Sequence, residues 1–251
     1  MGLANNQEDQ RRWWAKAILV GAVVGLIALP VGALGARFGI WPFMGGFMLL
    51  AVGVVLATIA FFLGIIAAVY ANSRGMHADR RSCLIGVAIS VVILGLMGNQ
   101  FMMASGVPPI HNISTDTQDP PDFDKVIALR DASGANPSEY DASVLADQQR
   151  SAYPFVKPLV SSESAATMFT RAVNTIESLG LELVSADERS GRVEATDTTF
   201  WFGFKDDVVI RVRPEGSGSV VDVRSVSRVG QSDLGKNAER IGAILNALSA
   251  S

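Results

Sequence analysis

Three long apolar segments without a charged residue dominate the first 104 positions of the chain. Residues 17–36, 43–71 and 83–104 give 20, 29 and 22 consecutive uncharged positions. A helix needs about 20 apolar residues to cross a hydrocarbon core about 30 Å thick. Helices of a soluble core usually carry a polar stripe, which these segments lack. The sequence therefore predicts a three-helix transmembrane region over residues 17–104, whose second helix is long enough to tilt or to extend into the interface.

The basic residues beside these segments predict their orientation. Positive charges lie before the first segment and between the second and third: Arg11, Arg12 and Lys16, then Arg74, Arg80 and Arg81. The turn between the first two segments carries only Arg37, and Lys125 is the next basic residue after the third. By the positive-inside rule, residues 1–16 and the 72–82 loop are cytoplasmic. We therefore expect a multi-pass membrane protein in which three crossings place everything after residue 105 on the opposite side.

The first segment could alternatively be a cleaved signal peptide, because basic residues precede it and small residues end it. Its apolar run is longer than the roughly 7–15 residues of a signal peptide, which favours a retained helix. No Asp, Glu, Lys, Arg or His lies inside the three segments, which disfavours a pump or transporter. Small residues at helix-packing intervals, Gly21, Gly25, Ala60, Gly64 and Ala68, suit packing among the chain's own helices or docking onto another membrane protein.

Charge divides the chain into two parts. Residues 1–104 contain seven Lys and Arg against three Asp and Glu, whereas residues 105–251 contain 14 against 21. The acidic second part disfavours nucleic-acid binding, which requires a basic face. One Cys excludes an internal disulfide, and with only two His it excludes a conventional zinc site. We expect no metal and no cofactor.

The second part has the pattern of an α+β domain. Residues 105–123 contain two Pro-Pro pairs and predict an extended connector, which leaves residues 124–251 for the exported domain. Helices are expected over 141–152, from a cap at Ser161 or Ser162 to Gly180, and after a cap at Ser232. Strands are expected at 181–186, 191–198, 200–205, 207–213 and 219–227. The prediction is an antiparallel sheet packed against helices.

Three stretches of this part resemble a known family. PPIHNISTDTQDPPDF, GRVEATDTTFWFGFKDDVVIRVR and RSVSRVGQSDLGKNAERI are similar to the domain of unknown function 1499, across most of residues 108–248. The resemblance implies a bacterial membrane-anchored or secreted protein and a fold, but no activity. Together with the orientation above, it implies a multi-pass protein of the bacterial inner (cytoplasmic) membrane with a periplasmic C-terminal domain. Many members are shorter and lack three preceding spans, so the resemblance does not account for the membrane part.

Charged and polar residues of the last strands form the candidate site. If the hairpin turns near residues 216–217, Arg211 lies opposite Asp222 and Arg224 lies opposite Val209. Guanidinium groups beside a helix N-terminus could bind an anion or a partner. The favoured alternative is a ladder of Asp and Arg that braces the sheet against a helix. The candidate residues are Arg211, Arg224, Ser227, Arg228, Ser232, Asn237 and Arg240.

These residues favour a membrane-anchored binding or accessory module, acting alone or within a membrane complex. The alternative is an enzyme that acts on an envelope substrate through the Arg, Asp and Ser cluster. Asp206 and Asp207 are adjacent on a strand and point to opposite faces, which disfavours joint acid and base catalysis. The aromatic run near Phe200 and Trp201 is expected to pack in the sheet, or else to contact lipid headgroups or a partner.

Overall fold

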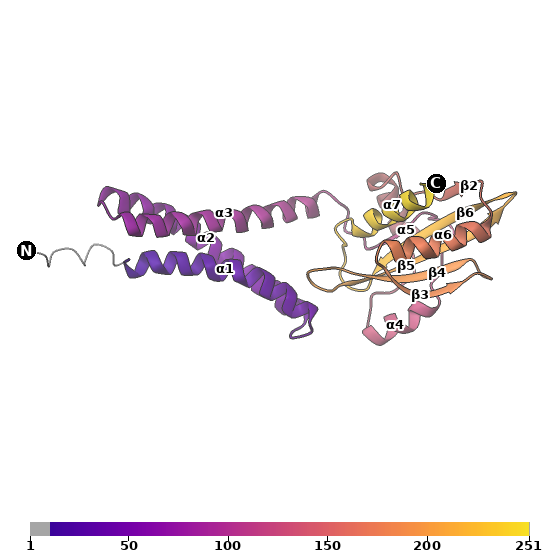
Figure 1. Cartoon of the computed structure of the whole chain (residues 1–251), viewed down its shortest axis with the longest axis horizontal. Helices are drawn as coiled ribbons and strands as arrows, with labels where there is room; N and C mark the ends of the chain where they lie inside the picture. The colour runs from indigo at the N-terminus through magenta and orange to yellow at the C-terminus, as the bar shows by residue number, and fades with distance from the viewer. Residues whose placement is uncertain (1–10, 251) are drawn as a thin grey trace, which may run out of the picture. The chain divides into compact units, whose positions relative to one another are not determined.

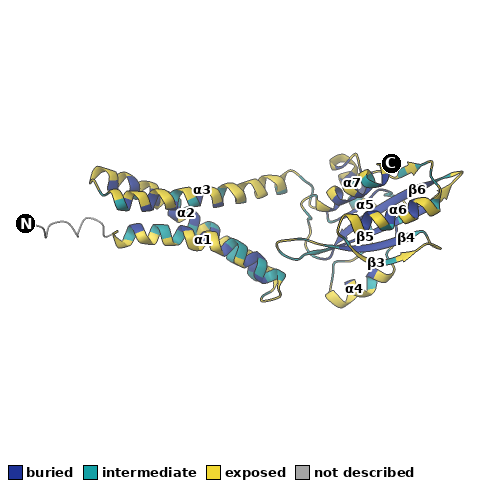
Figure 2. Cartoon of the chain, viewed as in Figure 1, coloured by how far each residue is buried: buried dark blue, intermediate teal, exposed yellow. Residues whose placement is uncertain are grey.

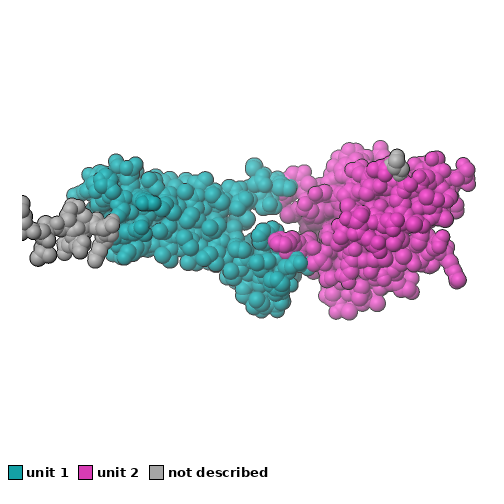
Figure 3. Space-filling model, viewed as in Figure 1, with its two compact units in different colours: residues 1–103, 201–203 teal, residues 104–200, 204–251 magenta. Residues whose placement is uncertain are grey.

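The computed structural model describes residues 11–250. The chain divides into two compact units, shown in different colours in Figure 3. Unit 1 comprises residues 1–103 and 201–203, and unit 2 comprises residues 104–200 and 204–251.

Unit 1 consists of three long apolar helices. They are α1 (Trp13–Arg37), α2 (Phe43–Ser73) and α3 (His77–Ser105), which runs two residues into unit 2. Each is long and apolar enough to cross a membrane, which confirms the three predicted segments as candidate spans. Exposed apolar residues lie along all three helices (Figure 2), as expected of surfaces that face lipid.

Small residues allow α1 and α2 to approach closely. A Cβ atom on Gly25 would lie 2.9 Å from the carbonyl oxygen of Gly53, and one on Gly32 would lie 2.8 Å from that of Gly46. Gly64 is closed in by side chains of α3 and α1. The expected packing role therefore holds for Gly25 and Gly64, whereas a Cβ on Gly21 would meet nothing within 4 Å.

Unit 2 contains a six-stranded sheet. The strands are β1 (Asn112–Ser114), β2 (Leu159–Ser161), β3 (Glu182–Asp187), β4 (Arg192–Thr198), β5 (Lys205–Glu215) and β6 (Gly218–Ser227). The helices are α4 (Lys125–Ser133), α5 (Ala142–Ala152), α6 (Ala165–Ser178) and α7 (Lys236–Ser249). The strand order is β1-β6-β5-β4-β3, and β2 shares the outer edge of β6 with β1. All pairs are antiparallel, so the α+β prediction is confirmed.

The two faces of the sheet have different coverings (Figure 1). Alternate strand residues such as Val193, Ile210 and Val223 join the apolar core beneath α6 and α7. Their neighbours, including Glu194 and Asp207, point to the opposite face, where residues of α4 contact them. The sheet is therefore buried on both sides, by an apolar layer on one face and by a largely polar layer on the other.

Three local predictions need correction. Residues 200–205 do not form a strand, because 199–204 is the turn between β4 and β5. Ser164, rather than Ser161 or Ser162, caps α6 by accepting a 3.2 Å hydrogen bond from the Thr167 N–H. Within the stretch expected to be connector, Asn112–Ser114 pairs with β6 as β1.

Candidate functional site

Strand β5 directs Asp206 and Asp207 to opposite faces of the sheet. Asp206 is 4% exposed and Asp207 is fully buried. An isolated buried carboxylate is unfavourable unless it is paired and hydrogen-bonded. Each of the two is held by guanidinium groups, from α7 on one face and from α4 and the end of β6 on the other. The sequence-predicted cluster is therefore not one site but several.

The first cluster surrounds Asp207. Its Oδ2 accepts from Arg130 Nη1 at 2.7 Å and from Arg228 Nε at 2.9 Å. Its Oδ1 accepts from Arg228 Nη2 and from Thr196 Oγ1, both at 2.8 Å. Both guanidinium groups are buried. Arg228 is thus occupied by a carboxylate of the chain itself, at the position where the sequence suggested a bound anion.

The second cluster lies under α7 on the other face. Arg240 donates to Asp197 Oδ2 at 2.6 Å and to Asp206 Oδ2 at 2.8 Å. Its Nη1 also donates to Asn237 Oδ1 at 2.7 Å. The amide nitrogen of Asn237 then donates to Ser227 Oγ at 2.9 Å. These bonds join α7 to β4, β5 and β6, so Ser227, Asn237 and Arg240 brace the helix against the sheet.

Arg224 lies in a third cluster that contains no direct carboxylate partner. It is 2% exposed and donates to Asn112 Oδ1, to the Pro121 carbonyl oxygen and to the Ser138 carbonyl oxygen. Its guanidinium carbon lies 5.3 Å from the centroid of the Phe123 ring. Burial lowers the pKa of Arg224 to about 10, because a charged group loses hydration there. Arg224 therefore holds the polar loops against the sheet through neutral acceptors.

The fourth cluster is nearer the surface. Asp222 is fully buried, and its Oδ2 accepts from Arg211 at 3.0 Å and from Arg213 at 2.8 Å. Arg211 also donates to the exposed Asp119 at 2.9 Å. Arg211 lies directly opposite Asp222 in the register, and Arg224 lies opposite Val209. Both cross-strand predictions are confirmed.

The start of α7 differs from the prediction. Asp233, rather than Ser232, satisfies the first turn, since its Oδ2 accepts from the Asn237 N–H at 2.7 Å and its Oδ1 from the Gly235 N–H at 2.9 Å. Ser232 only accepts a 3.3 Å bond from the Leu234 N–H. Burial raises the pKa of Asp233, although the backbone hydrogen bonds oppose that shift. A carboxylate already occupies the position proposed for an anion at this helix N-terminus.

Two partners in these clusters escaped sequence reasoning. Arg130 lies 77 residues before Asp207, and no local pattern links them. Glu194 is fully buried at the N-terminus of α4. Its Oε2 accepts from the Lys125 N–H at 2.8 Å, so the domain fills its own helix-terminal anion site. Isolated acidic and basic residues in a strand or a short helix carry no signal for such long-range pairs.

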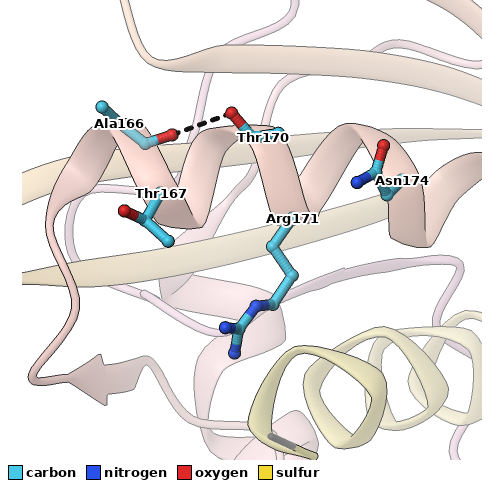
Figure 4. Close-up of a pocket in the computed structure, with 5 residues that line it drawn as sticks. All are labelled: Ala166, Thr167, Thr170, Arg171 and Asn174. Atoms are coloured by element: carbon cyan, nitrogen blue, oxygen red, sulfur yellow. Dashed lines mark hydrogen bonds between the residues drawn. The ribbon is translucent and has the colours of Figure 1, made fainter.

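An open hollow of about 520 Å³ lies away from these clusters, along α6 (Figure 4). Its lining residues are Ala166, Thr167, Thr170, Arg171 and Asn174. Arg171 is already bound to Glu163 at 2.6 Å and donates to the Leu248 carbonyl oxygen at 3.1 Å. Hydroxyl and amide groups therefore form the accessible chemistry of this hollow.

The fold and these clusters define an α+β domain that follows three candidate membrane helices. Residues 112–248 match the family described as "Protein of unknown function (DUF1499)". The match covers more than half of the chain, so the chain belongs to this family, and the predicted resemblance is confirmed. No curated protein matches the chain.

Proposed function

We propose that the protein is a binding or accessory module anchored in the bacterial inner membrane, with its α+β domain in the periplasm. The observation that carries the proposal is the mutual pairing of the buried ionisable residues. Asp207 pairs with Arg228, and Arg240 pairs with Asp206, in the interior of the domain rather than in an open cleft. The open hollow along α6 offers hydroxyl and amide groups, which suit recognition.

The enzymatic alternative requires an exposed nucleophile or acid within the Arg, Asp and Ser cluster. Ser225 is fully buried and donates to Asn237, and Ser227 is 4% exposed. A catalytic group must reach the reacting atom at hydrogen-bond distance. The packing of these serines beneath α7 therefore disfavours the alternative.

The orientation rests on the basic flanks of the helices. The Arg12 backbone N–H donates to Asp79 Oδ1 at 2.8 Å, which supports placing the N-terminus and the α2–α3 loop on one side of the membrane. The excess of Arg and Lys at that end favours the cytoplasm. After three crossings, unit 2 lies on the opposite side.

Reporter fusions test this orientation. A reporter after Ser251 should be active only in the periplasm, and one inserted near residue 76 only in the cytoplasm. Activity of the C-terminal fusion in the cytoplasm would contradict both the orientation and the compartment.

The hollow along α6 is the proposed contact surface of the module. The hollow is open, so it suits a shallow contact with a partner's surface better than the enclosure of a small ligand. Its lining combines hydroxyl and amide groups with apolar carbon atoms, which suits the mixed surface of a protein partner. Packing of small residues between α1 and α2 leaves the remaining helix faces for a second membrane protein.

Site-specific photocrosslinking in cells tests the contact surface. A photoreactive residue at Asn174, which is exposed in the hollow, should give a discrete adduct. The same residue at Ser217, exposed in the β5–β6 turn, is the matched control. Thr170→Arg should abolish the Asn174 adduct by filling the hollow. Equal labelling from both positions, or an adduct that survives Thr170→Arg, would refute this surface.

A further inference from the structure

The turn between β4 and β5 is apolar where a turn is usually polar. Residues 199–204, called here the aromatic turn, contain four aromatic residues in six positions. Phe200 is 70% exposed and Trp201 is 55% exposed. The two hairpin turns at the other end of the sheet, residues 188–191 and 216–217, contain no apolar side chain. Among the described turns between neighbouring strands, exposed aromatic residues therefore lie in the aromatic turn alone.

The strand register places that end beside the point where the chain enters the domain. Ser227 pairs with Asp206, next to the aromatic turn, and the Ser227 N–H donates to the His111 carbonyl oxygen. Neighbouring strands lie about 4.8 Å apart, so His111 lies only two strand spacings from the base of the turn. The chain enters the domain, and the aromatic turn joins β4 to β5, at the same end of the sheet.

The link from the last membrane helix to this end is short. α3 ends at Ser105, and Val107 already packs against the core of unit 2. Even fully extended, the six residues from Ser105 to His111 reach about 20 Å. This end of the domain is therefore held within reach of the interfacial region of the bilayer that α3 crosses.

A second apolar side chain lies at the same end. Leu234 is 43% exposed and has a φ of +56°, a left-handed conformation that is unfavourable for a residue other than glycine. It precedes Gly235, whose Cβ position would lie 3.6 Å from Val107. The strained backbone presents an apolar side chain outward, close to the segment that leads to α3.

We propose that the aromatic turn and Leu234 insert into the interfacial region of the membrane that carries α3. Trp and other aromatic side chains favour this region, because their rings are apolar and the indole N–H can still bond to water or headgroups. Insertion removes the exposed rings from water. It also gives the domain a second attachment, which fixes its tilt and keeps the α6 hollow at a set height above the bilayer.

Spin-label accessibility in the full-length chain tests this insertion. The background is Cys83→Ala, which removes the single native cysteine, and the protein is reconstituted in phosphatidylcholine nanodiscs. Nitroxides replace Phe200 or Leu234, and Ser217 is the control in the opposite turn. We expect the ratio of oxygen to nickel-chelate accessibility to be several-fold higher at both apolar positions than at 217.

A second variant isolates the contribution of the ring. Adding Trp201→Ser should lower the ratio at position 200 towards that of position 217 and leave 217 unchanged. A water-like ratio at 200 without Trp201→Ser would overturn the proposal. Low accessibility to both reagents at 200 would also overturn it, because the turn would then be packed against protein rather than lipid.

Discussion

Replacing Asp207 with Asn should destabilise the domain more than any other single change in its charged layers. The substitution keeps the shape of the side chain but turns one oxygen into an NH2 donor. Each oxygen of Asp207 accepts two hydrogen bonds, from Arg130 and Arg228 or from Arg228 and Thr196. Whichever oxygen is replaced, the new NH2 faces at least one guanidinium N–H from which it cannot accept a hydrogen bond, and two buried guanidinium groups lose their counter-charge.

The expected cost is the cost of breaking a buried ion pair, about 3–5 kcal/mol. A domain of this size has a free energy of unfolding of about 5–15 kcal/mol. From the middle of that range, about 10 kcal/mol, the variant loses roughly a third to a half. With a urea m-value of about 2 kcal/mol/M, the unfolding midpoint falls by about 1.5–2.5 M. Arg228→Ala should cost less, because Asp207 keeps its bond to Arg130.

Pulse proteolysis of the full-length chain in mild detergent measures this midpoint, since protease cleaves the unfolded domain selectively. Asp119→Asn is the matched control, because that carboxylate is 75% exposed and pairs with Arg211 at the surface. The control should change stability by less than about 1 kcal/mol. Equal midpoints for Asp207→Asn and Asp119→Asn would refute the structural role of the cluster. Phosphate that protects wild type but not Arg228→Ala would instead support an anion pocket.

Three further outcomes follow from local contacts. Asp233→Ala should cost about 0.5–2 kcal/mol in the same proteolysis assay and Ser232→Ala less, because Asp233 holds the first turn of α7. Burial raises the pKa of Asp233 above 3.8, so its contribution is complete below that value. The stability of wild type relative to Asp233→Asn should therefore fall as pH rises through the raised pKa, and an increase would contradict this sign. Gly25→Val should lower the resistance of the detergent-solubilised helices to SDS, whereas Gly21→Val, with nothing within 4 Å of its Cβ, should not; equal loss would refute close packing.

The sequence was sufficient where the signal is local and periodic. Uncharged runs gave the three candidate spans, and alternating apolar residues with a short turn gave the β5–β6 hairpin and its register. The aromatic turn was wrongly predicted as a strand because aromatic residues favour strands. In the structure Gly203 has a φ of +68°, which suits a turn. At the start of α7, serine and aspartate are adjacent and both are good caps, so sequence could not choose between them.

The candidate site was less predictable than the fold. Arg224 was expected to pair with carboxylates, but its acceptors include the carbonyl groups of Pro121 and Ser138. These two residues lie before and after α4, in loops that fold back onto the sheet. The partner of Asp207, Arg130, is similarly distant in sequence. Such contacts depend on how the loops fold back onto the sheet. No periodic pattern in a single sequence predicts the path of a loop.

The two adjacent aspartates of β5 link both layers of the domain to one strand. Asp207 meets two guanidinium groups, which leaves a net charge of +1 in its cluster, whereas Asp206 and Asp197 share Arg240, which leaves −1 in theirs. The clusters lie on opposite faces of the same sheet, so their charges offset each other. An apolar strand could bury as much surface, but it would not fix which helix packs on which face. Each guanidinium finds its carboxylate only when α4 lies on one face and α7 on the other, so the paired charges specify the arrangement of the layers.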